Sequence, residues 1–259
     1  MTAIIHNWKR FWCERGGTFN ASDGGYLTDP DSEYGRLLNP NALAFESISA
    51  KRCLVLLGEP GLGKTFSLEQ ALESVRAEAE VAGATLFHKN LRSYGEESRL
   101  VREVFESREI LTWLDGSDDL YLFLDSFDEA RMRIDTLSSI LEERLERCPA
   151  ERLHLRIACR TAEWPTSLES GLRKRWGEGL VGVYELLPLR ERDVEQAALD
   201  HALDPERFLA EINRVGVVPL AAKPITLRFL FRHIPRDERS SGHTERAVLA
   251  GVYSTLRRA

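Results

Sequence analysis

Residues 53–72 read CLVLLGEPGLGKTFSLEQAL, and this stretch decides the fold. Its first five residues are all apolar, which predicts a buried strand. A turn with three glycines follows, and from Lys64 onwards apolar residues recur at helical spacing. Gly58, Gly63, Lys64 and Thr65 complete the pattern G-x-x-x-x-G-K-T. A strand, a glycine-rich loop of this spacing and a helix are together typical of a phosphate-binding loop.

Each residue type in this loop has a chemical reason to be there. Glycines let the backbone curl, so that several N–H groups point at one centre where phosphate oxygens bind. The helix adds the positive end of its dipole. Lys64 offers a charge to the β- and γ-phosphates, and the Thr65 hydroxyl suits Mg²⁺. The alternative is a Gly-rich turn with a solvent-facing lysine, but the pattern has a chance frequency of only roughly one per cent in a chain of this length. We therefore predict a nucleotide-binding loop made of Gly58, Glu59, Pro60, Gly61, Leu62, Gly63, Lys64, Thr65 and Phe66.

Strand-like and helix-like segments alternate along the rest of this region. Apolar runs predict strands at residues 53–57, 84–88, 120–124, 153–159 and 180–187. Helical spacing predicts helices at residues 64–82, 99–114 and 134–148. Five strands separated by helices predict an α/β fold with a five-stranded parallel sheet and right-handed crossovers. Ligands of such sheets bind at the carboxyl ends of the strands.

Acidic residues follow the strand predicted at 120–124. Asp125 ends this strand, and Asp128 and Glu129 lie just beyond it. A carboxylate at a strand end near the phosphate loop can hold the nucleotide's Mg²⁺. A second acid a few residues later can orient or deprotonate an attacking water. Many strands end in a polar turn without any function. The glycine loop about sixty residues upstream is what favours a functional role for these acids. We predict Thr65 and Asp125 as magnesium ligands, and Asp128 or Glu129 as the catalytic acid.

An arginine ends the strand predicted at 153–159. Residues 157–161 read IACRT, and the guanidinium of Arg160 is placed to reach a γ-phosphate. The alternative is an ordinary surface arginine in a salt bridge. The chain has no Asn-Lys-x-Asp motif for guanine, so we expect ATP rather than GTP.

Composition excludes several classes of protein. The chain has 259 residues, 43% hydrophobic and 29% charged, with a net charge of −6. No apolar run approaches a membrane span, and the N-terminus does not read as a secretory signal. Four cysteines lack metal-ligand spacing, which favours free thiols in a reducing cytoplasm. The acidic balance gives no general attraction to nucleic acid or anionic lipid. We expect a cytoplasmic protein with no membrane and no direct nucleic-acid partner.

The first 49 residues are predicted to be a turn-rich lead that packs on the core. Trp8, Phe11 and Trp12 are spaced like one face of a short helix that docks there. A second hypothesis places Tyr26 or Leu27 over the nucleotide base, in which case Tyr26→Ala would change base preference.

At this point the motifs resemble a known family. The glycine loop, the sequence LFLDSFDE at residues 122–129 and the sequence CRT at residues 159–161 are similar to the NACHT branch of the STAND signal-transduction ATPases. Downstream, YELLPL at residues 184–189 resembles the family's exit into a small helical domain. The stretch at residues 218–227, VPLAAKPITL, resembles the proline motif of that domain.

This resemblance implies a fold and a set of roles. The sheet would be of the additional-strand type, with the arginine strand between the loop strand and the acidic strand. A P-loop nucleotide-binding domain would span residues 50–189, and a small helical domain residues 190–259. Lys64 and Thr65 would bind phosphate and Mg²⁺, Asp125 the metal, Arg160 would act as a sensor and Pro224 would contact adenine.

The resemblance also implies a function. The protein would be a slow ATPase switch that holds ADP when closed and self-associates with ATP bound. Bacterial members of the family commonly serve in defence against phage. Family members normally continue into a winged-helix domain, whereas this sequence stops in a helix-like segment at residues 245–258. We expect a fragment of a longer protein, with effector and sensor regions outside this chain, in preference to a reduced member of the family. The alternatives are a remodelling ATPase of the AAA+ type and a nucleotide-binding scaffold that does not hydrolyse.

Overall fold

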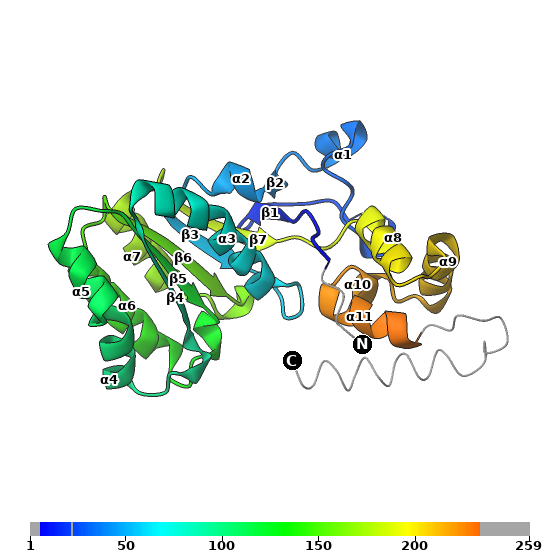
Figure 1. The fold of residues 1–259 in the computed structure, drawn as a ribbon. Coiled ribbons are helices and arrows are strands. Elements are labelled where there is room, and N and C mark those ends of the chain that lie inside the picture. The colour runs from blue at the N-terminus through cyan, green and yellow to red at the C-terminus, as the bar shows by residue number, and fades with distance from the viewer. Residues whose placement is uncertain (1–5, 22, 234–259) are drawn as a thin grey trace. The chain divides into compact units, whose positions relative to one another are not determined.

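The computed structural model describes residues 6–21 and 23–233 (Figure 1). The helix predicted at residues 245–258 lies outside the described residues. No helix in the described part of the chain is long and apolar enough to cross a membrane.

The strands form a mixed seven-stranded sheet. Their order is β2-β1-β7-β3-β6-β5-β4. The five predicted strands are present as β3 (Cys53–Leu57), β4 (Thr85–Asn90), β5 (Leu120–Asp125), β6 (Leu153–Cys159) and β7 (Val181–Leu186). They run parallel, and β6 lies between β3 and β5 as expected for the additional-strand type of P-loop NTPase fold. The sequence did not predict the other two strands, β1 (Phe11–Glu14) and β2 (Leu43–Ala44), which pair antiparallel.

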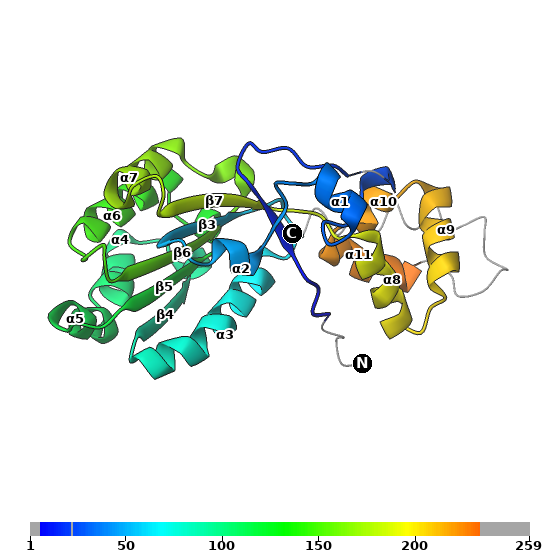
Figure 2. The same cartoon turned by 90° about the horizontal axis from the view of Figure 1, so that it is seen from above.

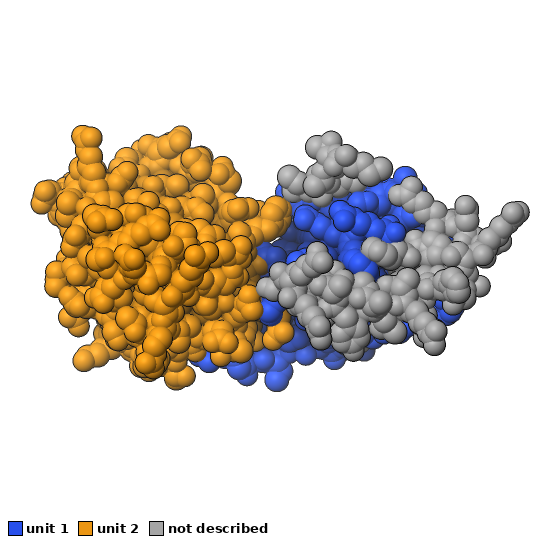
Figure 3. Space-filling view, turned by 90° about the horizontal axis from the view of Figure 1, so that it is seen from below, with its two compact units in different colours: residues 1–44, 60–63, 186–259 blue, residues 45–59, 64–185 orange. Residues whose placement is uncertain are grey.

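The chain divides into two compact units (Figure 3). Unit 1 contains residues 1–44, 60–63 and 186–259, and unit 2 contains residues 45–59 and 64–185. The phosphate loop is therefore divided along the chain, with its middle four residues in unit 1 and its two ends in unit 2.

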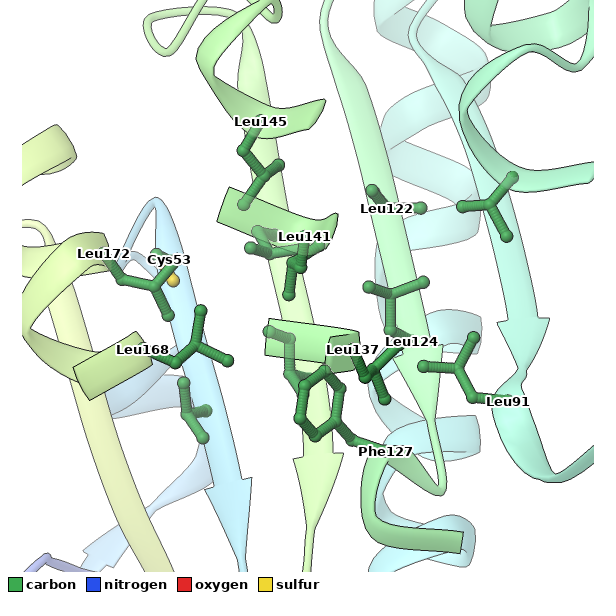
Figure 4. Packing of buried hydrophobic residues seen from close by; sticks show 14 of the residues in the cluster. Cys53, Leu91, Leu122, Leu124, Phe127, Leu137, Leu141, Leu145, Leu168 and Leu172 are labelled. Atoms are coloured by element: carbon green, nitrogen blue, oxygen red, sulfur yellow. The ribbon is translucent and has the colours of Figure 1, made fainter. Parts of the chain in front are cut away.

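Unit 2 is a sheet covered by helices on both faces (Figure 2). Its helices are α2 (Phe45–Ile48), α3 (Lys64–Ala82), α4 (Glu97–Leu100), α5 (Arg108–Asp115), α6 (Ile134–Glu146) and α7 (Thr166–Trp176). Alternate strand residues point to opposite faces, and every residue of β3 is buried, which explains why its sequence is apolar without interruption. One face packs against α6 and α7. Figure 4 shows this packing, with labels on Cys53, Leu91, Leu122, Leu124, Phe127, Leu137, Leu141, Leu145, Leu168 and Leu172.

The single helix predicted at residues 99–114 is wrong. The structure has the short helix α4, a π-helical turn at Val101–Phe105 and the separate helix α5. Ser107 has an extended backbone and its hydroxyl accepts from the Ile110 N–H (3.4 Å), so it begins α5 as an N-cap. The interval from Phe105 to Ile110 is five residues, which does not fit one continuous apolar face.

Unit 1 contains a helical core and the N-terminal lead. Its helices are α1 (Glu33–Leu38), α8 (Glu191–Asp200), α9 (Pro205–Val215), α10 (Val218–Ala221) and α11 (Pro224–His233). The short helix predicted from Trp8, Phe11 and Trp12 is wrong, because Phe11–Glu14 is strand β1. Phe11, Trp12 and Cys13 are all buried, so both faces of β1 are covered and packing prevails over the helical spacing. Tyr26 packs in a buried cluster with residues of α8–α11, and Leu27 is also buried.

Candidate functional site

The sheet register brings the predicted site residues of unit 2 to one edge. Leu57 of β3 is paired with Cys159 of β6, so the next residues, Gly58 and Arg160, leave the sheet side by side. Asp125 ends β5 at the same edge. The carboxyl ends of parallel strands therefore place the loop, the first acid and the arginine together, as the sequence predicted.

The phosphate loop has the backbone that its glycines were expected to provide. Gly61 and Gly63 have φ values of 81° and 94°, which are favourable only for glycine. Lys64 begins α3, and its ammonium donates to the carbonyls of Gly58 (2.6 Å) and Glu59 (3.3 Å). Burial lowers the pKa of Lys64, and the negative charge of Asp128 partly opposes this shift. An ammonium has three N–H groups, so it can hold two carbonyls and still donate to a phosphate.

The Thr65 hydroxyl at the start of α3 donates to the Asp125 carboxylate at the end of β5. The Asp125 carboxylate is buried and accepts from the Ser126 N–H (2.7 Å), the Thr65 hydroxyl (3.5 Å) and the Asn90 amide (3.3 Å). Burial raises the pKa of Asp125. Ser126 has φ 56° and ψ 45°, a left-handed conformation that turns the chain sharply after the strand.

This pair fits a magnesium ion in its chemistry. A hydroxyl and a carboxylate are hard oxygen ligands, and Mg²⁺ is usually held by one or two such groups together with phosphates and water. In the described part of the chain there is no group of three or more His, Cys, Asp and Glu residues arranged to hold a metal. Bound phosphate and water would supply the remaining ligands of such an ion.

The remaining predicted catalytic residues meet in one ion-pair network. Asp128 accepts from the Arg160 main-chain N–H (2.8 Å) and pairs with its Nε (2.9 Å). Glu129 pairs with Arg160 Nη2 (3.5 Å) and with the guanidinium of Arg92. The Asp128 side chain is only 4% exposed, whereas that of Arg160 is 33% exposed. The structure thus brings the acids and the predicted sensor together, but in contact with each other.

Pro224 lies beside the loop within unit 1. It begins α11, and a Cβ placed on Gly63 would lie 3.8 Å from Pro224 Cγ. The next residue, Ile225, donates its N–H to the Gly61 carbonyl (3.3 Å). The motif at residues 218–227 therefore contacts the phosphate loop, while its predicted adenine contact stays a prediction.

Sequence reasoning missed three polar residues. Asn90 ends β4 and Arg92 lies two residues beyond it. The strand predicted at residues 84–88 stops short of both, so its predicted end did not select them. Arg10 is also missed. Its guanidinium bonds the loop carbonyl of Leu62 from 52 residues away, and no local pattern signals such a contact.

The strand order, with β6 between β3 and β5, and the glycine-rich loop between β3 and α3 are those of the P-loop NTPase fold. No family model matches the chain, and no curated protein matches it. Among solved structures, similar chains include PCH-2 of C. elegans, with 16% identity and a TM-score of 0.40 over 82% of this chain and 57% of that one. Thermotoga maritima RuvB, a Holliday junction branch migration motor, has 13% identity and a TM-score of 0.38 over 79% of this chain and 69% of that one. A chain of the E. coli MS115-1 HORMA:CdnC:Trip13 complex has 15% identity and a TM-score of 0.39 over 88% and 71%. The chain spans little more than half the length of PCH-2, and at these scores the likenesses carry no argument about function.

Proposed function

We propose that this chain binds ATP and ADP with Mg²⁺ and hydrolyses ATP slowly, as a molecular switch. The observation that carries the proposal is the meeting of three groups at one edge of the sheet. Lys64 and Thr65 begin α3, and the Thr65 hydroxyl lies 3.5 Å from the Asp125 carboxylate. Phosphate held by the loop and by Lys64 would complete an oxygen shell for Mg²⁺ between Thr65 and Asp125.

The state of the acids supports a switch rather than a fast enzyme. A general base must reach the attacking water, and Asp128 and Glu129 instead hold Arg160. Arg160 must leave them before it can reach a γ-phosphate. Hydrolysis then requires a rearrangement of a charged network as well as the chemical step, which favours slow turnover.

The assignment to a particular kind of switch protein rests on the sequence motifs at residues 58–65, 122–129, 159–161 and 218–227. Their resemblance to NACHT-type STAND ATPases supports a closed form with ADP and an open form with ATP that self-associates. In that interpretation effector and sensor regions lie outside this chain, and defence against phage is one setting for such a switch. Arg160 would report the γ-phosphate and Pro224 would contact the adenine.

The nucleotide that co-purifies with the protein, together with its rate of turnover, tests this proposal. Tightly held ADP with very slow turnover is the expected result. Fast multiple turnover would instead favour a remodelling ATPase of the AAA+ type. Binding without cleavage, unaltered by Asp128→Asn, would favour a scaffold.

A matched pair of lysine variants sharpens the measurement. Lys64 follows β3, and Lys51 precedes it at the opposite end, where its ammonium donates to Gly179. Lys64→Ala is expected to abolish nucleotide retention, while Lys51→Ala retains it. Equal retention by both variants would refute the phosphate-binding role of the loop.

A further inference from the structure

The phosphate loop is held from within unit 1 by a buried arginine. Arg10 Nη1 donates to the Leu62 carbonyl and Nη2 donates to the Leu187 carbonyl, each at 2.7 Å. Arg10 itself is 7% exposed. One guanidinium therefore joins the loop to the segment that follows β7, although Leu62 and Leu187 are far apart in the sequence.

The environment of Arg10 is unusual for an arginine. Burial lowers its pKa to about 10. The carboxylate of Asp193 attracts it, but both oxygens of that carboxylate accept hydrogen bonds from Arg190 (2.7 and 2.9 Å). Within the described part of the chain, the hydrogen bonds of Arg10 go to the two main-chain carbonyls. Burying a cation costs desolvation free energy, and uncharged carbonyls offset less of that cost than a carboxylate would.

The middle of the loop has other contacts from the same unit. Gly61 accepts from the Ile225 N–H (3.3 Å), and a Cβ placed on Gly61 would overlap Ile225 Cγ2. A Cβ on Gly63 would lie 3.4 Å from Arg10 Nη1. Arg10 and the start of α11 therefore bond to two successive carbonyls of the loop, those of Gly61 and Leu62, and lie close to Gly63.

We propose that Arg10 is a positioning residue that fixes the curvature of the phosphate loop. This inference rests on the proposed nucleotide-binding function. A guanidinium is a planar fork with donors at fixed angles, so two carbonyls bonded to it keep a fixed separation. With the Leu62 carbonyl held, the amides of the following residues keep one direction before a nucleotide arrives. Such preorganisation raises affinity for phosphate because the loop is already ordered.

The test compares Arg10→Gln and Arg10→Lys with a control next to them in sequence. Lys9 is exposed and pairs with Asp31, so Lys9→Gln removes a neighbouring charge without touching the loop. The first measurement is hydrogen exchange in nucleotide-free protein at residues 60–66 and at the Ile225 amide, which is protected only while Gly61 keeps its place. Both Arg10 variants should exchange there about tenfold faster, because a hydrogen bond to a charged group is lost, and Lys9→Gln should match the wild type.

The second measurement separates loop geometry from general destabilisation. Affinity for ATP should fall about tenfold in both Arg10 variants, while affinity for adenosine, which lacks phosphates, stays unchanged. Wild-type protein that binds no ATP would refute the proposed function, and the exchange measurement would still decide the role of Arg10. Unchanged exchange and unchanged ATP affinity in a folded Arg10 variant would overturn the positioning role. Loss of folding in both variants would also overturn it, since Arg10 would then support the whole unit and not the loop.

Discussion

The contact between Asp128 and Arg160 gives the sharpest quantitative prediction. A double-mutant cycle with Arg160→Ala and Asp128→Asn isolates the guanidinium, because the bond from the Arg160 main-chain N–H to Asp128 survives in Arg160→Ala. A hydrogen bond to a charged group contributes about 1.5–3 kcal/mol. The Asp128 side chain is buried, but one third of Arg160 is exposed to screening water, so we expect a coupling energy of about 1–2 kcal/mol.

Urea unfolding of nucleotide-free protein measures this coupling energy. Arg147 and Glu143 provide a matched control, since their charged atoms are 2.8 Å apart but both side chains are more than half exposed. That pair should show a coupling of only about 0.3–0.5 kcal/mol. If the two cycles give equal coupling energies, burial of Asp128 does not strengthen its contact with Arg160, and the argument for a held resting state is wrong.

Three further predictions concern the same edge of the sheet and the loop. Burial raises the pKa of Asp125, so the folded protein binds the carboxyl proton more tightly than the unfolded chain does. As pH rises from the ordinary pKa of 3.8 through the raised pKa, the unfolding free energy of the wild type should therefore fall relative to that of Asp125→Asn. A difference in unfolding free energy that does not change with pH would contradict this. Gly61→Ala should cost about 1–3 kcal/mol in thermal or urea unfolding, since φ is 81° and the new Cβ meets Ile225, and adding Ile225→Ala should recover the steric part only. Arg160→Ala should reduce the discrimination of ATP from ADP in calorimetry more than it reduces total binding, whereas equal loss for both nucleotides would contradict the sensor role.

The fold was predictable because its signals are local. An apolar run such as residues 53–57 has few alternatives once every position is buried, and the motif at Lys64 marks the start of a helix. Strand β1 was not predictable in this way, since Phe11 and Trp12 also suit a helix face, and their burial in unit 1 decides the outcome. The break at Ser107 was missed because apolar residues on either side of it each recur at helical spacing, while the five-residue interval between Phe105 and Ile110 and the N-cap at Ser107 separate them.

The location of the site residues in the sheet was predictable, because the carboxyl ends of parallel strands meet at one edge regardless of side-chain conformation. Asn90 was missed because β4 continues two residues beyond residue 88, where the apolar run that predicted the strand ends. Arg10 is different in kind. Its partners, Leu62 and Leu187, are main-chain carbonyls, which carry no residue identity that a sequence pattern could reveal.

The direction of the Arg160 side chain cannot be predicted from the sequence, and the proposed sensor role depends on it. A coupling of 1–2 kcal/mol to Asp128 shifts the population of this arrangement by about five- to thirtyfold. For the guanidinium to leave the acids, its interaction with a γ-phosphate must be more favourable than this coupling free energy. ADP has no γ-phosphate and cannot supply such an interaction. In the proposed switch, the same pair of residues would keep the ADP form closed and respond to ATP. The population shift on ATP binding would stay small unless Asp128 and Glu129 also gain new partners when Arg160 leaves them.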